Sequence, residues 1–144
     1  MSYSVDVNVL LYASDRASPK HPSALQFLES RATDPELFCV AWPILMSYVR
    51  IATHPRVFAH PLAPHEALTN VEALLGLPRV RVLTEGDNFL EVYREVTGGI
   101  SVRGNLVPDA YLAALLRQHD VRTLFTTDTD FKKFSFLNVR DPFA

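Results

Sequence analysis

Short apolar runs alternate with amphipathic segments along the chain. Runs rich in β-branched and aromatic residues predict strands over 5–11, 37–41, 80–83, 123–126 and 136–139, the first of them turning helical near Leu10. Apolar residues at helical spacing predict helices over 22–30, 43–51, 64–75, 88–96 and 105–119. Because the strands are continuous apolar runs rather than alternations, the pattern favours a parallel sheet with both faces covered.

The expected fold class is therefore an α/β three-layer sandwich, with a central, mostly parallel sheet flanked by helices. A chain of 144 residues predicts one domain, 1–144, which is large enough to bury a core without disulfides or a structural metal. In open α/β sheets, ligands bind at the carboxyl ends of the strands, near the point where the strand order reverses. Polar residues at that edge are the first candidates for function.

Composition narrows the class of protein further. Apolar residues make up 48% of the chain and charged residues 21%, the balance of a globular protein. A formal net charge of −2 excludes a polybasic nucleic-acid coat and a cationic membrane peptide, but it leaves open a nuclease with a local basic rim. Cys39 is the sole cysteine, which excludes a disulfide framework and a cysteine zinc site. The sequence starts without a signal-peptide pattern and no apolar run reaches about 18 residues, so we expect a soluble, cytoplasmic protein without a membrane span.

Four aspartates stand where apolar sequence meets a predicted strand end or helix start. Asp6 lies within the first apolar run, with Asn8 two positions further on and on the same strand face. Asp109 begins an otherwise apolar helical stripe, and Asp128 and Asp130 directly follow the fourth predicted strand. A buried carboxylate needs hydrogen bonds, an ion pair or a metal ion, since burying it alone costs several kcal/mol.

Each acid also has a purely structural explanation. Asp109 is placed to begin a helix, Asp128 or Asp130 to cap a short helix, and Asp6 to pair with an arginine. Convergence at one edge favours a shared site, because two carboxylates about 4 Å apart repel by roughly 4 kcal/mol at an effective dielectric constant of about 20. A proton or a cation must relieve that repulsion. An all-oxygen cluster without cysteine or histidine ligands selects Mg²⁺ or Mn²⁺.

A divalent ion held by these acids suits in-line hydrolysis of a phosphodiester, since such an ion binds a phosphate oxygen, activates water and stabilises the leaving oxygen. The sequence contains neither GxxxxGK[ST] nor GxGxxG, which disfavours nucleoside triphosphates and dinucleotides. The zinc motif HExxH and the serine-hydrolase motif GxSxG are also missing. The acids therefore indicate a metal-dependent nuclease.

Three segments of the chain carry a family resemblance, namely 5–10 (VDVNVL), 105–110 (NLVPDA) with its continuation 112–115 (LAAL), and 126–131 (TTDTDF). These segments resemble PIN-domain proteins, in particular the toxin ribonucleases of VapBC toxin–antitoxin systems. The stretch 50–58 (RIATHPRVF) is similar to one branch of those toxins. Together the segments extend over essentially the whole chain, with the acids in the order and spacing of the family.

The resemblance implies a Mg²⁺- or Mn²⁺-dependent endoribonuclease. It implies that Asp6, Asp109 and Asp128 bind the metal and that Asp130 supports them. The family usually has a glutamate at the position of Ser47, which can orient water but supplies no charge for a second metal ion. The resemblance also implies a homodimeric toxin and an antitoxin that occupies a hydrophobic groove and blocks the acidic pocket.

Polar and basic residues near the acids complete the expected site. The residues expected to orient ligands or water are Asn8, Ser47 and Thr127, with Thr126 also expected to bond a carboxylate or the strand end. The expected basic rim for RNA phosphates consists of Arg103, Lys132 and Arg50. The alternative for these basic residues is an ordinary solvated surface.

Two other functions stay open at this point. The serine at position 47 favours a catalytically weakened PIN-like module that binds RNA or protein without turnover. A phosphohydrolase with an aspartate nucleophile ranks last, because the segment Asp6-Val7-Asn8 lacks the second aspartate of that chemistry.

Overall fold

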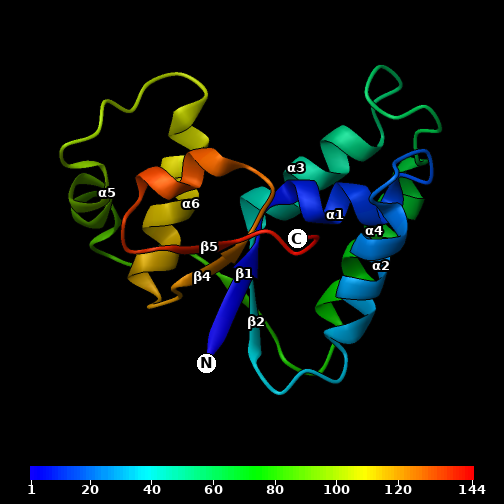
Figure 1. Cartoon of the computed structure of the whole chain (residues 1–144), viewed down its shortest axis with the longest axis horizontal. Coiled ribbons are helices and arrows are strands. Elements are labelled where there is room, and N and C mark those ends of the chain that lie inside the picture. Colours follow the sequence, from blue (N-terminus) through cyan, green and yellow to red (C-terminus); the bar gives the residue numbers. More distant parts are fainter.

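A five-stranded, wholly parallel sheet forms the centre of the computed structural model, which describes residues 1–144 (Figure 1). The strands are β1 (Ser2–Val5), β2 (Leu37–Ala41), β3 (Val80–Leu83), β4 (Thr123–Phe125) and β5 (Asn138–Arg140). Their order across the sheet is β3-β2-β1-β4-β5, so the first strand of the chain lies in the middle.

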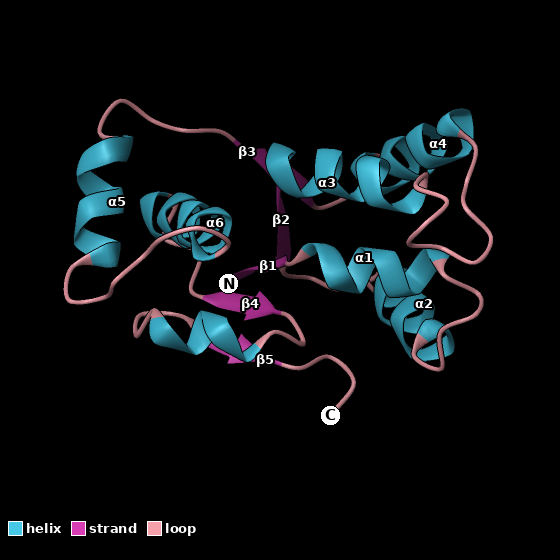
Figure 2. Cartoon of the chain, turned by 90° about the horizontal axis from the view of Figure 1, so that it is seen from above, coloured by secondary structure: helices cyan, strands magenta, loops and turns pink.

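Helices cover both faces of this sheet. The α-helices are α1 (Val7–Ser14), α2 (His21–Ser30), α3 (Trp42–Ala52), α4 (Pro64–Leu75), α5 (Phe89–Thr97) and α6 (Leu106–Gln118), and a 3-10 helix, η1, spans Thr129–Lys133. Figure 2 shows α1 to α4 on one side of the strands and α5 with α6 on the other. The α/β three-layer sandwich predicted from the sequence is confirmed.

The apolar runs and stripes of the sequence become the core between these layers. Val5 of β1, Phe38 of β2 and Leu124 of β4 are buried within the sheet. Leu45 of α3 and Leu116 of α6 are completely buried in the core, and their helices lie on opposite sides of the sheet (Figure 2). The predicted bounds of α4 and β3 match the structure at both ends.

The first predicted strand is much shorter than the sequence pattern suggested. β1 ends at Val5 and α1 begins at Val7, so the strand prediction for 7–11 is wrong. The Asp6 carboxylate accepts a hydrogen bond from the Val7 N–H at 2.7 Å, and this cap begins a helix although Val7 and Val9 are β-branched. Asn8 consequently does not share a strand face with Asp6 but lies in the first turn of α1.

The last strand is displaced relative to its prediction over 136–139. β5 spans Asn138–Arg140, because the Leu137 N–H donates to the Phe134 carbonyl at 3.0 Å in the turn that follows η1. Phe136 and Leu137 therefore belong to that turn, and Leu137 packs into the core from it.

The strand order determines where a functional site is expected. The chain moves outward from β1 to β2 and β3, and then returns through α5 and α6 to β4 on the other side of β1. The order therefore reverses between β1 and β4, the position at which open α/β sheets bind ligands. The carboxyl ends of these two strands lead directly into α1 and η1.

Candidate metal centre

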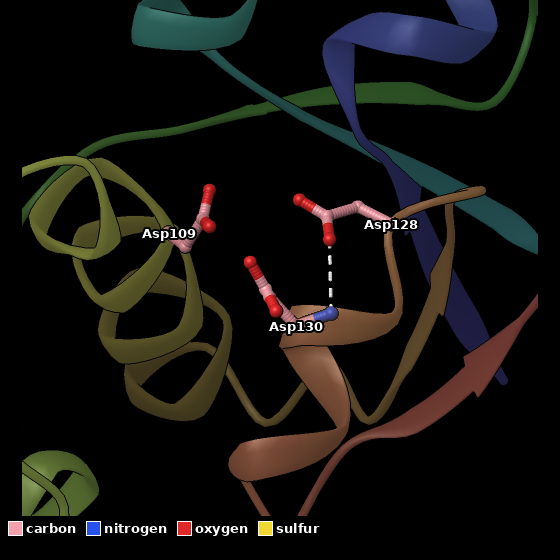
Figure 3. A group of neighbouring side chains, drawn as sticks. All are labelled: Asp109, Asp128 and Asp130. Atoms are coloured by element: carbon pink, nitrogen blue, oxygen red, sulfur yellow. Dashed lines mark hydrogen bonds between the residues drawn. The ribbon is translucent and has the colours of Figure 1, made fainter.

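Three carboxylates converge at the carboxyl edge of the sheet, where α6 and η1 meet (Figure 3). Asp109 projects from the first turn of α6, Asp128 precedes η1 as its N-cap, and Asp130 lies within η1. One carboxylate oxygen from each residue lies within 4.8 Å of the others. The cap prediction for Asp128 is confirmed, since its Oδ1 accepts the Asp130 N–H at 2.9 Å, and the same residue belongs to the cluster.

Asp6 lies beside this trio and is held by hydrogen bonds to the protein. Its side chain is 7% exposed. Its Oδ1 accepts the Val7 N–H at 2.7 Å, and its Oδ2 accepts Asn8 Nδ2 at 3.2 Å and Thr126 Oγ1 at 3.0 Å. Asp6 is thus the buried, fixed member of the group of acids.

Thr126 connects Asp6 to the rest of the site. The residue is 2% exposed, and its hydroxyl donates to Asp6 Oδ2 while accepting hydrogen bonds from Asn8 Nδ2 at 3.0 Å and the Asp128 N–H at 3.0 Å. Thr127 contributes its backbone N–H to Asn8 Oδ1 at 3.4 Å, and its hydroxyl makes no hydrogen bond. The supporting side chain is therefore Thr126 rather than Thr127.

The acids raise one another's proton affinity. Burial, followed by the charges of Asp6, Asp128 and Asp130, raises the pKa of Asp109 to about 6, which Lys133 partly opposes. Burial is also the largest cause that raises the pKa of Asp6, while the hydrogen bonds from Val7 and Thr126 lower it and the Asp128 charge raises it. These mutual effects place Asp6 within electrostatic reach of Asp109 and Asp128.

Arginine pairing does not explain the acids. The salt bridges of the structure are Arg31–Asp34, Arg122–Asp120 and Lys133–Asp130, the last at 3.8 Å on the surface. Asp6, Asp109 and Asp128 have no basic partner, so the proposed pairing of Asp6 with an arginine is wrong.

The donor set fits a hard divalent cation. All ligand atoms are carboxylate oxygens, the type that Mg²⁺ and Mn²⁺ prefer. Burial raises the pKa of Asp109 most, and the charges of Asp6, Asp128 and Asp130 raise it further, a repulsion that a cation would relieve. The residues that could hold such an ion are Asp109, Asp128 and Asp130, with Asp6 adjacent.

Four further residues predicted for the site make no hydrogen bond or salt bridge to these acids, namely Ser47, Arg50, Arg103 and Lys132. Ser47 is half-buried on α3 and makes no side-chain hydrogen bond. Arg50 is exposed in the last turn of α3, Arg103 is exposed and donates to Ser101 Oγ at 2.9 Å, and Lys132 is exposed on η1. The basic side chain that faces an acid of the cluster is Lys133, through its contact with Asp130.

This fold and acid cluster define a class of protein, the PIN domain. The family model described as "PIN domain" matches residues 3–137, and the chain belongs to that family. Among curated proteins, the chain is 43% identical over 144 residues to "Ribonuclease VapC48" of Mycobacterium tuberculosis, covering 100% of this chain and 99% of that protein. "Ribonuclease VapC43" of the same species is 33% identical over 138 residues, covering 96% and 93% respectively.

Solved structures support the fold at lower sequence identity. VapBC2 from Rickettsia felis, bound to a DNA fragment from its promoter, aligns with a TM-score of 0.69 at 16% identity over 98% of each chain. Mycobacterium tuberculosis VapC20, described as a sarcin-ricin loop cleaving toxin, aligns with a TM-score of 0.66 at 18% identity, covering 96% of this chain and 98% of that one. The family resemblance and the fold expected from it are confirmed. None of the helices described above is both long and apolar enough to span a membrane.

Proposed function

We propose that this protein is a metal-dependent endoribonuclease, the toxin component of a type II toxin–antitoxin system. The observation that carries the proposal is the convergence of the Asp109, Asp128 and Asp130 carboxylate oxygens within 4.8 Å, with no basic partner for the first two. The ribonuclease names of relatives that match the whole chain support the same activity.

Within this proposal, Asp6, Asp109 and Asp128 hold Mg²⁺ or Mn²⁺ and Asp130 extends the ligand set. When bound, the ion supplies charge neutralisation at the phosphate and a more acidic water molecule. Thr126 and Asn8 fix the Asp6 carboxylate, so that this ligand does not need to reorganise.

Exposed basic residues hold the RNA in this scheme. Arg103, Lys132 and Arg50 contact backbone phosphates and position the RNA without reading its bases. Their distribution over α3, η1 and the segment between α5 and α6 suits a polynucleotide better than a small phosphate ester.

An RNA cleavage assay with purified protein tests the enzyme proposal. Wild-type protein is expected to cleave structured RNA in Mg²⁺ or Mn²⁺, and Asp109→Asn is expected to lose at least about 100-fold in rate, because removal of a metal ligand exceeds the typical effect of removing a supporting group. Asp87→Asn, which alters an exposed acid near α5, is the matched control and keeps its rate. Equal cleavage by wild type and Asp109→Asn would identify a contaminating nuclease and end the proposal.

The partner in this proposal is an antitoxin, as the toxin–antitoxin titles of the structural neighbours describe for those proteins. A groove of about 200 Å³ among α1, α2, α3 and α4 offers a predominantly apolar surface for a partner segment. Its largest apolar side chains are Leu10, Leu25, Leu28, Leu45, Val71 and Leu74. A homodimeric toxin and a cytoplasmic location, where RNA is available, belong to the same proposal.

A catalytically weakened binding module is the second candidate function. Ser47 favours it, because this half-buried residue offers a hydroxyl where the family resemblance implies a carboxylate. The cleavage assay separates the two candidates, since both are expected to bind metal and only the enzyme turns over RNA.

A further inference from the structure

A polar cavity lies along α1, beyond Ser14 and at the opposite end of that helix from Asp6. Its volume is about 710 Å³, and its walls come from the end of α1, the start of α2, the segment between α3 and α4, and α4 itself. None of its lining residues belongs to the acidic cluster. The metal-centre proposal therefore leaves this cavity without a role.

Basic groups dominate the lining of the cavity. Three of the five histidines of the chain, His21, His60 and His65, line it together with Arg16. Glu66 is the one acid of the lining, and its Oε1 accepts the Ala63 N–H at 3.0 Å. Arg16 makes no salt bridge. Four groups that carry or can acquire positive charge thus face a single carboxylate that already has a backbone partner.

The ring of His21 is oriented by the protein. Its Nδ1 lies 3.0 Å from the Tyr12 carbonyl oxygen, and because a carbonyl only accepts, Nδ1 carries the hydrogen. The Nε2 atom of this ring is therefore the one that can take up a second proton and donate to an anion.

The polar cavity continues into the apolar groove described above. Both share Ala13, Ser14, Leu25 and Asn70, so α1 borders one surface that is apolar around Leu10 and basic beyond Ser14. A ligand that fills both parts needs apolar side chains in one half and negative charge in the other. A protein segment has that character, whereas RNA offers no apolar side chains for the groove.

We propose that Arg16, His21, His60 and His65 form an anion-recognition site for acidic side chains of the partner protein whose apolar side chains occupy the adjoining groove. This inference rests on the antitoxin partner proposed above. The charged and titratable groups that face the bound carboxylates are these four residues and Glu66.

Nuclear magnetic resonance of the histidine rings tests the site in the full-length chain. The probe is a synthetic helical peptide with leucines at positions i, i+3, i+4 and i+7 followed by two glutamates, and the matched peptide carries two glutamines instead. The glutamate peptide is expected to move the ring-proton resonances of His21, His60 and His65 more than the glutamine peptide does. His54 and His119 lie outside the cavity and serve as controls within the same molecule, with unchanged resonances.

A substitution at Arg16 tests the same site by peptide affinity, without relying on the histidine signals. Arg16→Gln is expected to weaken binding of the glutamate peptide about fivefold, the upper contribution of an exposed ion pair, and to leave the glutamine peptide unaffected. Arg94→Gln, at an exposed arginine of α5, is the control and leaves both affinities unchanged.

Three results would overturn the inference. They are equal binding of the two peptides with unmoved histidine resonances, binding of neither peptide, and displacement of the glutamate peptide by an RNA octamer that moves the same three histidine resonances. The last result would assign the cavity to RNA. RNA cleavage that depends on Asp109 is measured separately, so failure of the anion site and failure of the ribonuclease proposal are distinguishable.

Discussion

The two sides of the acidic cluster are built in opposite ways. On the strand side, Asp6 accepts three hydrogen bonds and Asp128 is fixed through its own carboxylate and its N–H. On the helix side, Asp109 makes no side-chain hydrogen bond, and burial and its acidic neighbours raise its pKa to about 6. One side is pre-organised by the protein, and the other lacks the counter-charge that would stabilise its ionised form.

This difference separates two physical contributions to a metal centre. Hydrogen bonds hold the Asp6 carboxylate in position without a cation. The conformational entropy of this side chain is therefore lost when the protein folds and not when the cation binds. The repulsion at Asp109 is an energy that the cation relieves when it binds. Variants on the two sides are therefore expected to change stability in opposite directions.

The largest change in stability is expected from Thr126→Val on the strand side. Loss of the hydroxyl removes hydrogen-bond partners from Asp6, Asn8 and the Asp128 N–H, which costs about 2 kcal/mol of unfolding free energy because these groups are partly or fully buried. RNA cleavage is expected to fall about 10- to 100-fold. Urea unfolding and the cleavage assay measure the two losses.

Two controls sharpen that experiment. Thr126→Ser restores the hydroxyl and is expected to recover most of the unfolding free energy and most of the RNA cleavage rate. Thr127→Val, whose hydroxyl makes no hydrogen bond, changes stability by no more than about 0.5 kcal/mol. Equal losses at positions 126 and 127 would contradict the hydrogen-bond assignment.

Asp109→Asn on the helix side is expected to stabilise the metal-free protein. A carboxyl whose folded-state pKa is raised binds its proton more tightly in the folded state, so wild-type stability falls as the pH rises from about 4 to about 6 and stays lower above that range. At pH 7 the asparagine is therefore expected to raise the free energy of unfolding by about 1 kcal/mol. This value includes a reduction for solvent screening, because the Asp109 side chain is only half-buried. The melting temperature is expected to rise by about 3 °C.

The dependence of this stabilisation on Mg²⁺ and on pH tests whether it comes from the repulsion among the acids. The advantage of Asp109→Asn is expected to shrink in millimolar Mg²⁺, and also as the pH falls from about 6 to about 3, where the wild-type carboxyl becomes neutral in both states. Calorimetry with Asp87→Asn as the control measures the difference. An advantage that stays constant with metal and pH would show that Asp109 does not share a cation site with its neighbours.

The smallest effect is expected from Ser47→Glu, which adds the carboxylate that the family resemblance implies. If position 47 faces the cluster, Mg²⁺ binds up to about fivefold more tightly, since one further negative charge about 8 Å from a divalent ion contributes about 1 kcal/mol in water. Ser47→Gln matches the size without the charge and leaves the affinity unchanged. Identical calorimetric titrations for both variants would exclude position 47 from the centre.

The layers of the fold and the acids of the site were predictable because each leaves a local pattern. The continuous apolar run over 37–41 and the periodic stripe over 64–75 report burial directly, and the structure retains both as β2 and α4. Asp109, Asp128 and Asp130 were recognisable because each follows or begins such a pattern at the edge where strand ends meet.

The details that the sequence pattern missed depend on contacts between distant segments. Asp6 ends β1 by capping α1 while its own N–H donates to the Phe125 carbonyl of β4, an arrangement that the run of valines does not report. The two neighbouring threonines are chemically identical, and which hydroxyl meets Asp6 depends on how β4 ends beside β1. Residue propensity and hydrophobic periodicity predict neither where β1 ends nor which threonine hydroxyl bonds Asp6.

The strand order also has a consequence for how the protein is made. Asp6 and Thr126 stand 120 positions apart, yet they share a hydrogen bond across the β1–β4 boundary. A ribosome exposes β1, β2 and β3 first, and the nascent chain then carries no Asp128, Asp130 or Thr126 with which to complete the centre. For the proposed ribonuclease, this order of synthesis means that a partly made chain lacks the complete acidic site and cannot cleave RNA before its synthesis ends.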